Sequence, residues 1–170
     1  MKIVIAMDSF KGTLKAHEAC QITAGAITET ISDAELVLKP MADGGEGTAI
    51  AMIKAADGQW IQQTVMGPLP DMQVEAGFAW FEADKTALVE MASASGLELI
   101  SKEQANPLKT TTYGTGQLIK AAIKYKPRKI LLAIGGSATV DGGIGAAMAL
   151  GWKFLDRHNK PVGPGGMALE

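Results

Sequence analysis

The apolar run at the N-terminus is the feature that most constrains the fold of this chain. Residues Lys2–Met7 read KIVIAM, a continuous β-branched stretch without the alternation of a half-buried strand. Such a run is typical of a strand buried on both faces in a parallel sheet. Residues 13–31 then carry apolar side chains at helical spacing behind a plausible N-cap, Thr13, and Glu35–Lys39 is a second short apolar run. The order strand, helix, strand predicts a parallel pair with a crossover helix, and hence an α/β fold.

The pattern changes near residue 59. A second helix is predicted over residues 46–56, but three strands then follow one another without a helix between them: Gln59–Met66, Met72–Phe81 and Thr86–Met91. Strands joined only by turns predict an antiparallel or mixed sheet. This change predicts a second domain or a long insertion, and we divide the chain into residues 1–63, the first part of one α/β domain, and residues 64–170, the first part of a second, mixed-sheet α/β domain.

Charge and cysteine content exclude several classes of protein. With 16 Lys and Arg against 18 Asp and Glu, the chain has no positive excess to neutralise a nucleic acid backbone, so we predict no nucleic acid partner. The single cysteine, Cys20, forms no internal disulfide and fits a reducing compartment. The apolar runs are too short for a signal peptide or a membrane span, so we predict a cytoplasmic protein without a membrane partner.

Glycine is the compositional anomaly, with 20 glycines in 170 residues against a usual share of about 7%. The strongest cluster, Gly135–Gly143, follows a predicted buried strand and precedes a short predicted helix. Backbone N–H groups in such a loop can bind an anion, with the hydroxyls of Ser137 and Thr139 as further donors and Asp141 as an oxygen ligand for Mg²⁺. The alternative is a tight strand-to-helix turn in which Asp141 is only a cap.

A second glycine loop, Met41–Thr48, also joins a predicted strand to a predicted helix. Its two carboxylates, Asp43 and Glu46, lie on either side of Gly44 and Gly45 and suit either metal binding or proton acceptance from a substrate hydroxyl. The alternative is an arrangement in which both carboxylates cap the first turn of the helix.

Three more segments offer polar groups. Asp8, Ser9 and Lys11 follow the first strand, at the sheet edge where ligands bind in open α/β folds. The segments Ser93–Gly96 and Thr110–Gly116 are predicted loops that bring the hydroxyls of Ser93, Ser95 and Thr115. Segments of this composition are also ordinary helix caps. The chain contains neither a Walker A sequence nor a complete GxGxxG.

Six segments together resemble the N-terminal portion of bacterial glycerate kinases. They are MKIVIAMDSFKGTL, PMADGGEGT, GPLP, ALVEMASASGLELI, NPLKTTTYGTGQLI and ILLAIGGSATVDGGIGAAMALGWKFLD, and they are distributed along nearly the whole chain in the family's order. The resemblance implies a flavodoxin-like domain followed by a mixed-sheet domain. Family members are considerably longer, so it also implies that this chain is truncated. Met7 stands where the family usually has proline.

The resemblance implies transfer of the γ-phosphoryl group of ATP to D-glycerate with Mg²⁺, to give 2-phosphoglycerate rather than 3-phosphoglycerate, in organic acid catabolism. We expect Asp43 or Asp8 to orient or deprotonate the hydroxyl, Lys11 to offset negative charge, and Asp141 to lie near Mg²⁺. The alternatives are another small hydroxy-acid kinase and an inactive anion-binding fragment. The residues expected to contact substrate or phosphate are Ser9, Gly44, Gly45, Glu46, Ser93, Ser95, Thr115, Gly135, Gly136, Ser137 and Thr139.

Overall fold

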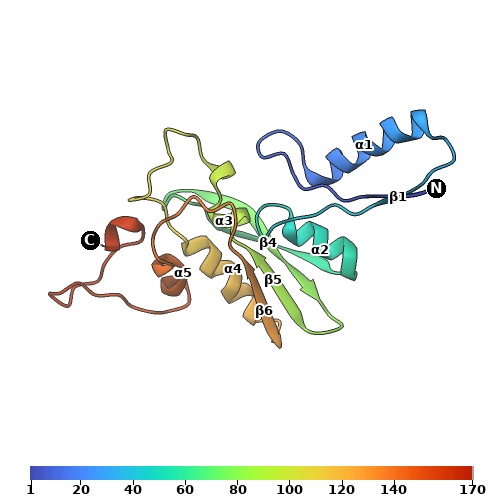
Figure 1. The fold of residues 1–170 in the computed structure, drawn as a ribbon. Coiled ribbons are helices and arrows are strands. Elements are labelled where there is room, and N and C mark those ends of the chain that lie inside the picture. The colour runs from blue at the N-terminus through green and yellow to red at the C-terminus, as the bar shows by residue number, and fades with distance from the viewer. Residues whose placement is uncertain (170) are drawn as a thin grey trace. The chain divides into compact units, whose positions relative to one another are not determined.

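The computed structural model describes residues 1–169 and divides the chain into two compact units, one of residues 1–43 and one that begins at Gly44. Each unit is described by itself (Figure 1). The predicted α/β class is confirmed, with a small parallel sheet in the first unit and a mixed sheet in the second. Within residues 1–169, no helix is long and apolar enough to cross a membrane.

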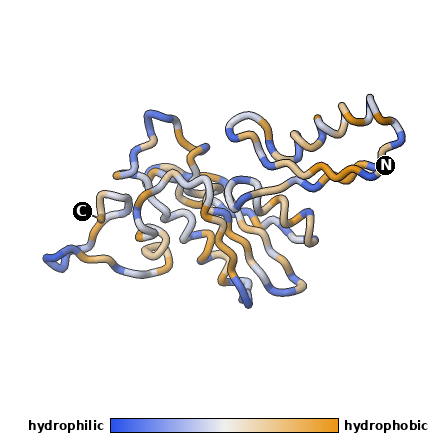
Figure 2. Tube along the Cα trace, in the orientation of Figure 1, coloured by the Kyte–Doolittle hydropathy of each residue, from blue (hydrophilic) through white to orange (hydrophobic). Residues whose placement is uncertain are grey.

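The first unit is a parallel strand pair with its crossover helix. Strands β1 (Lys2–Ile5) and β2 (Glu35–Leu38) pair in parallel, with Lys2 opposite Glu35. Helix α1 (Ala16–Thr30) joins them and buries Ala19 and Cys20. It begins after the predicted N-cap, because Thr13 donates instead to the Phe10 carbonyl in the preceding turn. Figure 2 shows the two paired strands as a hydrophobic segment, as the apolar runs of the sequence predict.

The second unit contains a four-stranded mixed sheet in the order β3-β4-β5-β6. The pairs β3/β4 and β4/β5 are antiparallel, whereas β5 and β6 are parallel. Its strands and longer helices are α2 (Thr48–Ala56), β3 (Gln59–Met66), β4 (Gln73–Phe81), β5 (Thr86–Glu90), α4 (Tyr113–Ile123), β6 (Lys129–Ala133) and α5 (Ile144–Ala149).

Helices cover both faces of this sheet. On one face, Leu118 and Ala122 of α4 pack in a cluster with Phe78 and Val89. On the other face, α2 packs in a second cluster around Ala79, Phe81 and Leu88. Fully burying a large apolar side chain contributes about 1.5–3 kcal/mol, so this packing makes the sheet a rigid base for the loops at its ends. Helix α2 packs on β4 and β5, so it belongs to the second compact unit, which begins at Gly44. The domain boundary after residue 63 stays a prediction.

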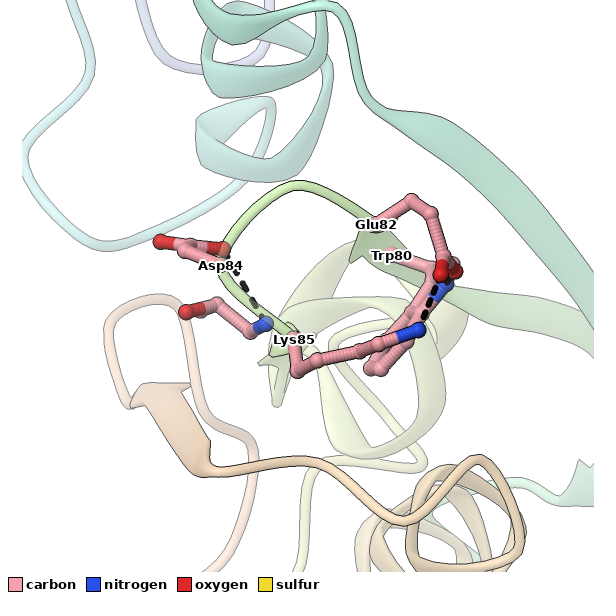
Figure 3. Close-up of polar contacts among 5 residues, drawn as sticks. Trp80, Glu82, Asp84 and Lys85 are labelled. Atoms are coloured by element: carbon pink, nitrogen blue, oxygen red, sulfur yellow. Dashed lines mark hydrogen bonds and ion pairs between the residues drawn. The ribbon is translucent and has the colours of Figure 1, made fainter.

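A turn at residues 82–85 fixes the β4/β5 hairpin (Figure 3). The Trp80 Nε1–H group donates to the Glu82 carboxylate over 2.8 Å, and the Lys85 ammonium forms an ion pair with the same carboxylate. These two donors, Lys85 first, lower the pKa of Glu82. The Thr86 N–H group donates to Asp84 over 3.1 Å. The turn lies at the end of β5 opposite Glu90.

Two segments predicted as loops are helical. Residues Ala92–Ser95 form the short helix α3, followed by a 3-10 turn at Leu97–Leu99. Helix α4 begins at Tyr113 and therefore includes Gly114 and Gly116. A Cβ atom on Gly114 would overlap the Met66 carbonyl, and one on Gly116 would overlap the backbone of Ala146 in α5. These two glycines therefore permit close packing, which the composition of the segment did not indicate.

Candidate functional site

The two glycine loops meet within the second unit. The Gly135 N–H group donates to the Gly44 carbonyl over 2.8 Å. A Cβ atom on Gly135 would lie 2.7 Å from Gly45 Cα, so no other residue fits there without displacing the neighbouring loop. Gly136 adopts φ +70°, which favours glycine. The sequence predicts each loop separately, and the structure places them in contact.

Glu90, the last residue of β5, holds the start of α2 beside this contact. Its side chain is buried, with 6% exposed. One carboxylate oxygen accepts the Gly47 N–H over 3.2 Å and the other accepts the Ala49 N–H over 2.9 Å. The helix has no side-chain cap of its own, because its N-cap is Gly47 at φ +83°. Glu90 therefore caps α2 from a strand more than forty residues later in the chain.

Burial dominates the electrostatics of Glu90. It raises the pKa of the carboxyl, and the backbone donors of Ala49, Gly47 and Thr48 offset only part of that effect. The surrounding strand TALVE is buried throughout and otherwise uncharged. A charge in such surroundings is destabilising unless hydrogen bonds satisfy it. The N–H groups of Gly47 and Ala49 thus stabilise the buried Glu90 carboxylate, and the carboxylate in turn fixes the loop that carries them.

The first half of the second loop runs along α3. The Leu97 N–H donates to the Gly136 carbonyl over 2.9 Å, and the Ala138 N–H donates to the Ser95 carbonyl over 2.8 Å. The Ser137 and Thr139 hydroxyls are half-buried and lie 2.8 Å apart in a mutual hydrogen bond. The loop is therefore fixed by backbone pairing, and its two hydroxyls lie next to each other.

Asp141 organises the second half of that loop. It is 1% exposed and accepts hydrogen bonds on both oxygens. The Thr112 N–H and Oγ1–H donate over 2.8 and 2.9 Å, Gly143 N–H over 3.0 Å, and Gly145 N–H over 3.2 Å. The Thr111 hydroxyl is a further donor at 3.4 Å. Asp141 thus links the starts of α4 and α5. This matches the alternative interpretation from the sequence, in which Asp141 is a cap.

The surroundings of Asp141 do not fit a Mg²⁺ ligand. Mg²⁺ prefers oxygen ligands in octahedral geometry and retains several waters. The groups around Asp141 are N–H and O–H donors, and they already use the lone pairs that a cation would need. The residues present therefore suit a buried anchor rather than a metal site.

The remaining predicted residues occupy different surroundings. The Ser93 hydroxyl donates to the Glu90 carbonyl over 2.8 Å, beside the glycine loops. The Ser95 and Thr115 hydroxyls are fully buried and hydrogen-bonded to each other over 2.8 Å. Glu46 is exposed on the loop that precedes α2. Ser93 and Glu46 thus lie on the segments that form the loop contact, whereas Ser95 and Thr115 join α3 to α4.

Four predicted residues belong to the first unit. Asp8, Ser9 and Lys11 follow β1, where the Ser9 N–H donates to the Asp8 carboxylate over 2.6 Å and the Asp8 and Lys11 side chains are exposed. Asp43 is the exposed last residue of that unit. Their roles stay predictions that rest on the sequence.

Sequence reasoning missed Glu90 and Thr112. The signal for Glu90 was present: it is the one charged residue of a strand whose other members are uncharged and buried. Thr112 lay in a segment singled out for its hydroxyls, but its role depends on Asp141, which is distant in the chain.

Comparison with known proteins supplies the family. The model of the "Glycerate kinase family" matches residues 3–170. The chain belongs to the glycerate kinase family. It is 47% identical over 169 residues to a "Glycerate kinase" of Haemophilus influenzae and 47% identical over 169 residues to a "Glycerate 2-kinase" of Escherichia coli. In each case the match covers 99% of this chain and 44% of the relative.

A solved structure supports the same membership. The crystal structure of a candidate glycerate kinase 2 from Salmonella typhimurium LT2 superposes with a TM-score of 0.78 at 43% identity, covering 100% of this chain and 45% of the other. The chain therefore spans less than half the length of these glycerate kinase relatives. The predicted family resemblance is confirmed over almost all of the sequence.

Proposed function

We propose that the protein is an ATP-dependent glycerate kinase that transfers the γ-phosphoryl group of ATP to D-glycerate, with 2-phosphoglycerate as the product, and that it serves organic acid catabolism. The observation that carries the proposal is the contact between the Gly44 and Gly135 loops, in a chain that matches the family over residues 3–170. The names of the relatives from Haemophilus influenzae and Escherichia coli support the same activity.

The chemistry of phosphoryl transfer suits the groups on these loops. Such transfer requires positioning and stabilisation of negative charge rather than covalent catalysis. Ser137 and Thr139 provide adjacent hydroxyls on a loop fixed by backbone hydrogen bonds. We assign them to oxygens of the phosphate or of the glycerate carboxylate. Asp43 is the proposed general base for the glycerate hydroxyl, and this role, like those proposed for Asp8 and Lys11, rests on the sequence alone.

ATP and Mg²⁺ are the proposed cofactors. Mg²⁺ supplies charge neutralisation at the phosphate oxygens when bound, and it needs only one or two protein carboxylates. Glu46 is solvent-exposed on the loop before α2, whereas Asp141 is 1% exposed, so a hydrated cation can reach Glu46 but not Asp141. We therefore propose Glu46 as the protein ligand on the glycine loops.

Substitution of Asp43 tests the assignment in the full gene product. If Asp43 is the general base, D43A lowers kcat with D-glycerate about 100-fold or more. The matched control is D33A, which removes another exposed aspartate of the first unit. Wild-type turnover in D43A would contradict the assignment. Faster phosphorylation of another hydroxy acid than of D-glycerate would favour a different kinase, and binding of ATP without turnover would favour an anion-binding protein.

A further inference from the structure

Glu90 lies at the point where the two glycine loops are held together, yet phosphoryl transfer as derived above assigns it no role. Its carboxylate contacts the backbone of Gly47 and Ala49, directly after Glu46. Its own backbone carbonyl accepts the Ser93 hydroxyl over 2.8 Å. One residue therefore contacts both the loop before α2 and the helix α3 that flanks the second glycine loop.

The loop that Glu90 holds also has a local restraint, because the Thr48 hydroxyl donates to the Gly45 carbonyl over 2.8 Å. Gly44 and Gly47 both adopt positive φ, at +92° and +83°, a conformation that glycine adopts without steric strain. The first turn of α2 has no side-chain cap of its own. The Gly135 hydrogen bond holds the loop at Gly44, and Glu90 holds it at Gly47 and Ala49. The segment that carries Glu46 is thus fixed at both ends.

We infer that Glu90 is a positioning residue for the proposed kinase reaction, whose two carboxylate oxygens fix the Gly44–Ala49 segment and thereby the substrate-facing groups on it. This inference rests on the proposed function. Because each oxygen takes a different N–H group, a carboxylate fulfils the role and a carboxamide does not. In E90Q, one of the two N–H groups faces the NH₂ of the new side chain, and one hydrogen bond is replaced by a donor–donor contact.

The two carboxylate contacts also occupy the N–H groups that open helix α2. A helix N-terminus commonly binds phosphate through such groups. Here Gly47 and Ala49 already donate to Glu90, which carries negative charge when ionised. Glu90 therefore occupies two of the first N–H groups of α2, so we do not expect a phosphate to bind through them.

Steady-state kinetics of the full gene product separate a positioning role from a merely structural one. A structural loss reduces the amount of folded enzyme and so lowers the maximal rate, while the KM of the remaining enzyme is unchanged. A displaced Gly44–Ala49 loop instead changes the proposed substrate site in every folded molecule, and so changes KM. We expect E90Q to raise the KM for D-glycerate or for Mg·ATP about tenfold or more, a change equivalent to one lost hydrogen bond to a charged group.

Two further variants complete the experiment. E82Q removes an exposed carboxylate at the opposite end of β5 and keeps both wild-type KM values. E90M removes both hydrogen bonds, so it displaces the loop at least as far as E90Q does and raises the same KM. Unchanged KM values in a folded Glu90 variant would overturn the inference. Failure of the wild-type protein to phosphorylate D-glycerate would instead overturn the proposed function.

Discussion

The Gly135 N–H group donates to the Gly44 carbonyl over 2.8 Å and joins two loops that lie far apart in the sequence. One loop follows the first unit and leads into α2, and the other follows β6. The contact has no space for a Cβ atom at Gly135. It is therefore the relationship that turns two separate glycine-rich segments into one candidate site.

Substitution of Gly135 by alanine is expected to destabilise the protein. The new Cβ atom would lie 2.7 Å from Gly45 Cα and force one loop away from the other, which costs about 1–3 kcal/mol in unfolding free energy. Urea denaturation measures the change. The control is G25A, because Gly25 lies in α1 with open space around it, and alanine there stabilises a helix by about 0.5–1 kcal/mol. Equal stability of G135A and wild type would contradict the close contact.

Asp141 is expected to act as an anchor in the absence of any metal. D141N places an NH₂ group among N–H and O–H donors, so at least one hydrogen bond to a charged group is lost, at about 1.5–3 kcal/mol. Thermal unfolding in excess EDTA measures the loss. D156N is the control, because Asp156 also accepts turn N–H groups but is exposed. An unfolding temperature that falls in D141N only when Mg²⁺ is present would favour the metal-ligand role instead.

The buried carboxyl of Glu90 gives a pH dependence of defined sign. Its folded-state pKa is raised above 4.5 by burial. As the pH rises from 4.5 toward the folded pKa, the unfolded chain loses this proton while the folded protein retains it, so the wild type loses stability. E90Q has no such proton. The unfolding free energy of wild type minus that of E90Q therefore falls from pH 4.5 to pH 7.5, as measured by urea denaturation. A difference that grows with pH would contradict the burial of this group.

Residues 1–170 by themselves are expected to turn over slowly or not at all. This segment spans 44% of the length of the Haemophilus influenzae and Escherichia coli relatives, and we expect the remaining part of such a protein to contribute to binding both substrates. A coupled assay with D-glycerate and Mg·ATP, run beside the full gene product, measures the difference. Comparable kcat values for the two would contradict this expectation.

The sequence predicted the elements whose signals are local. The apolar runs before Asp8 and around residues 35–39 gave the parallel pair β1/β2, and three strands in succession gave the antiparallel part of the mixed sheet. The paired strands are found as predicted, but their burial on both faces is not: Val4 of β1 is 59% exposed and Leu38 of β2 is 37% exposed. The glycine loops were also predicted, since clustered glycines between strand and helix have a local conformational cause.

What the sequence could not supply depends on contacts between distant segments. Glycine is unfavourable inside helices, so the pattern at Gly114 and Gly116 indicated a loop, but the structure needs these residues for contact with Met66 and Ala146. The capping of α2 by Glu90 joins residues more than forty positions apart. The sequence offered a cap as one of two roles for Asp141, and the structure agrees with it. The sequence did not indicate that Thr112, which is distant in the chain, also donates to this carboxylate.

The compound that the full gene product forms from D-glycerate is the most direct test of the proposed kinase activity. After incubation with Mg·ATP, ³¹P NMR distinguishes 2-phosphoglycerate, 3-phosphoglycerate and unreacted ATP. We expect consumption of ATP with 2-phosphoglycerate as the main phosphorylated product. Unreacted ATP, or 3-phosphoglycerate as the main product, would contradict it.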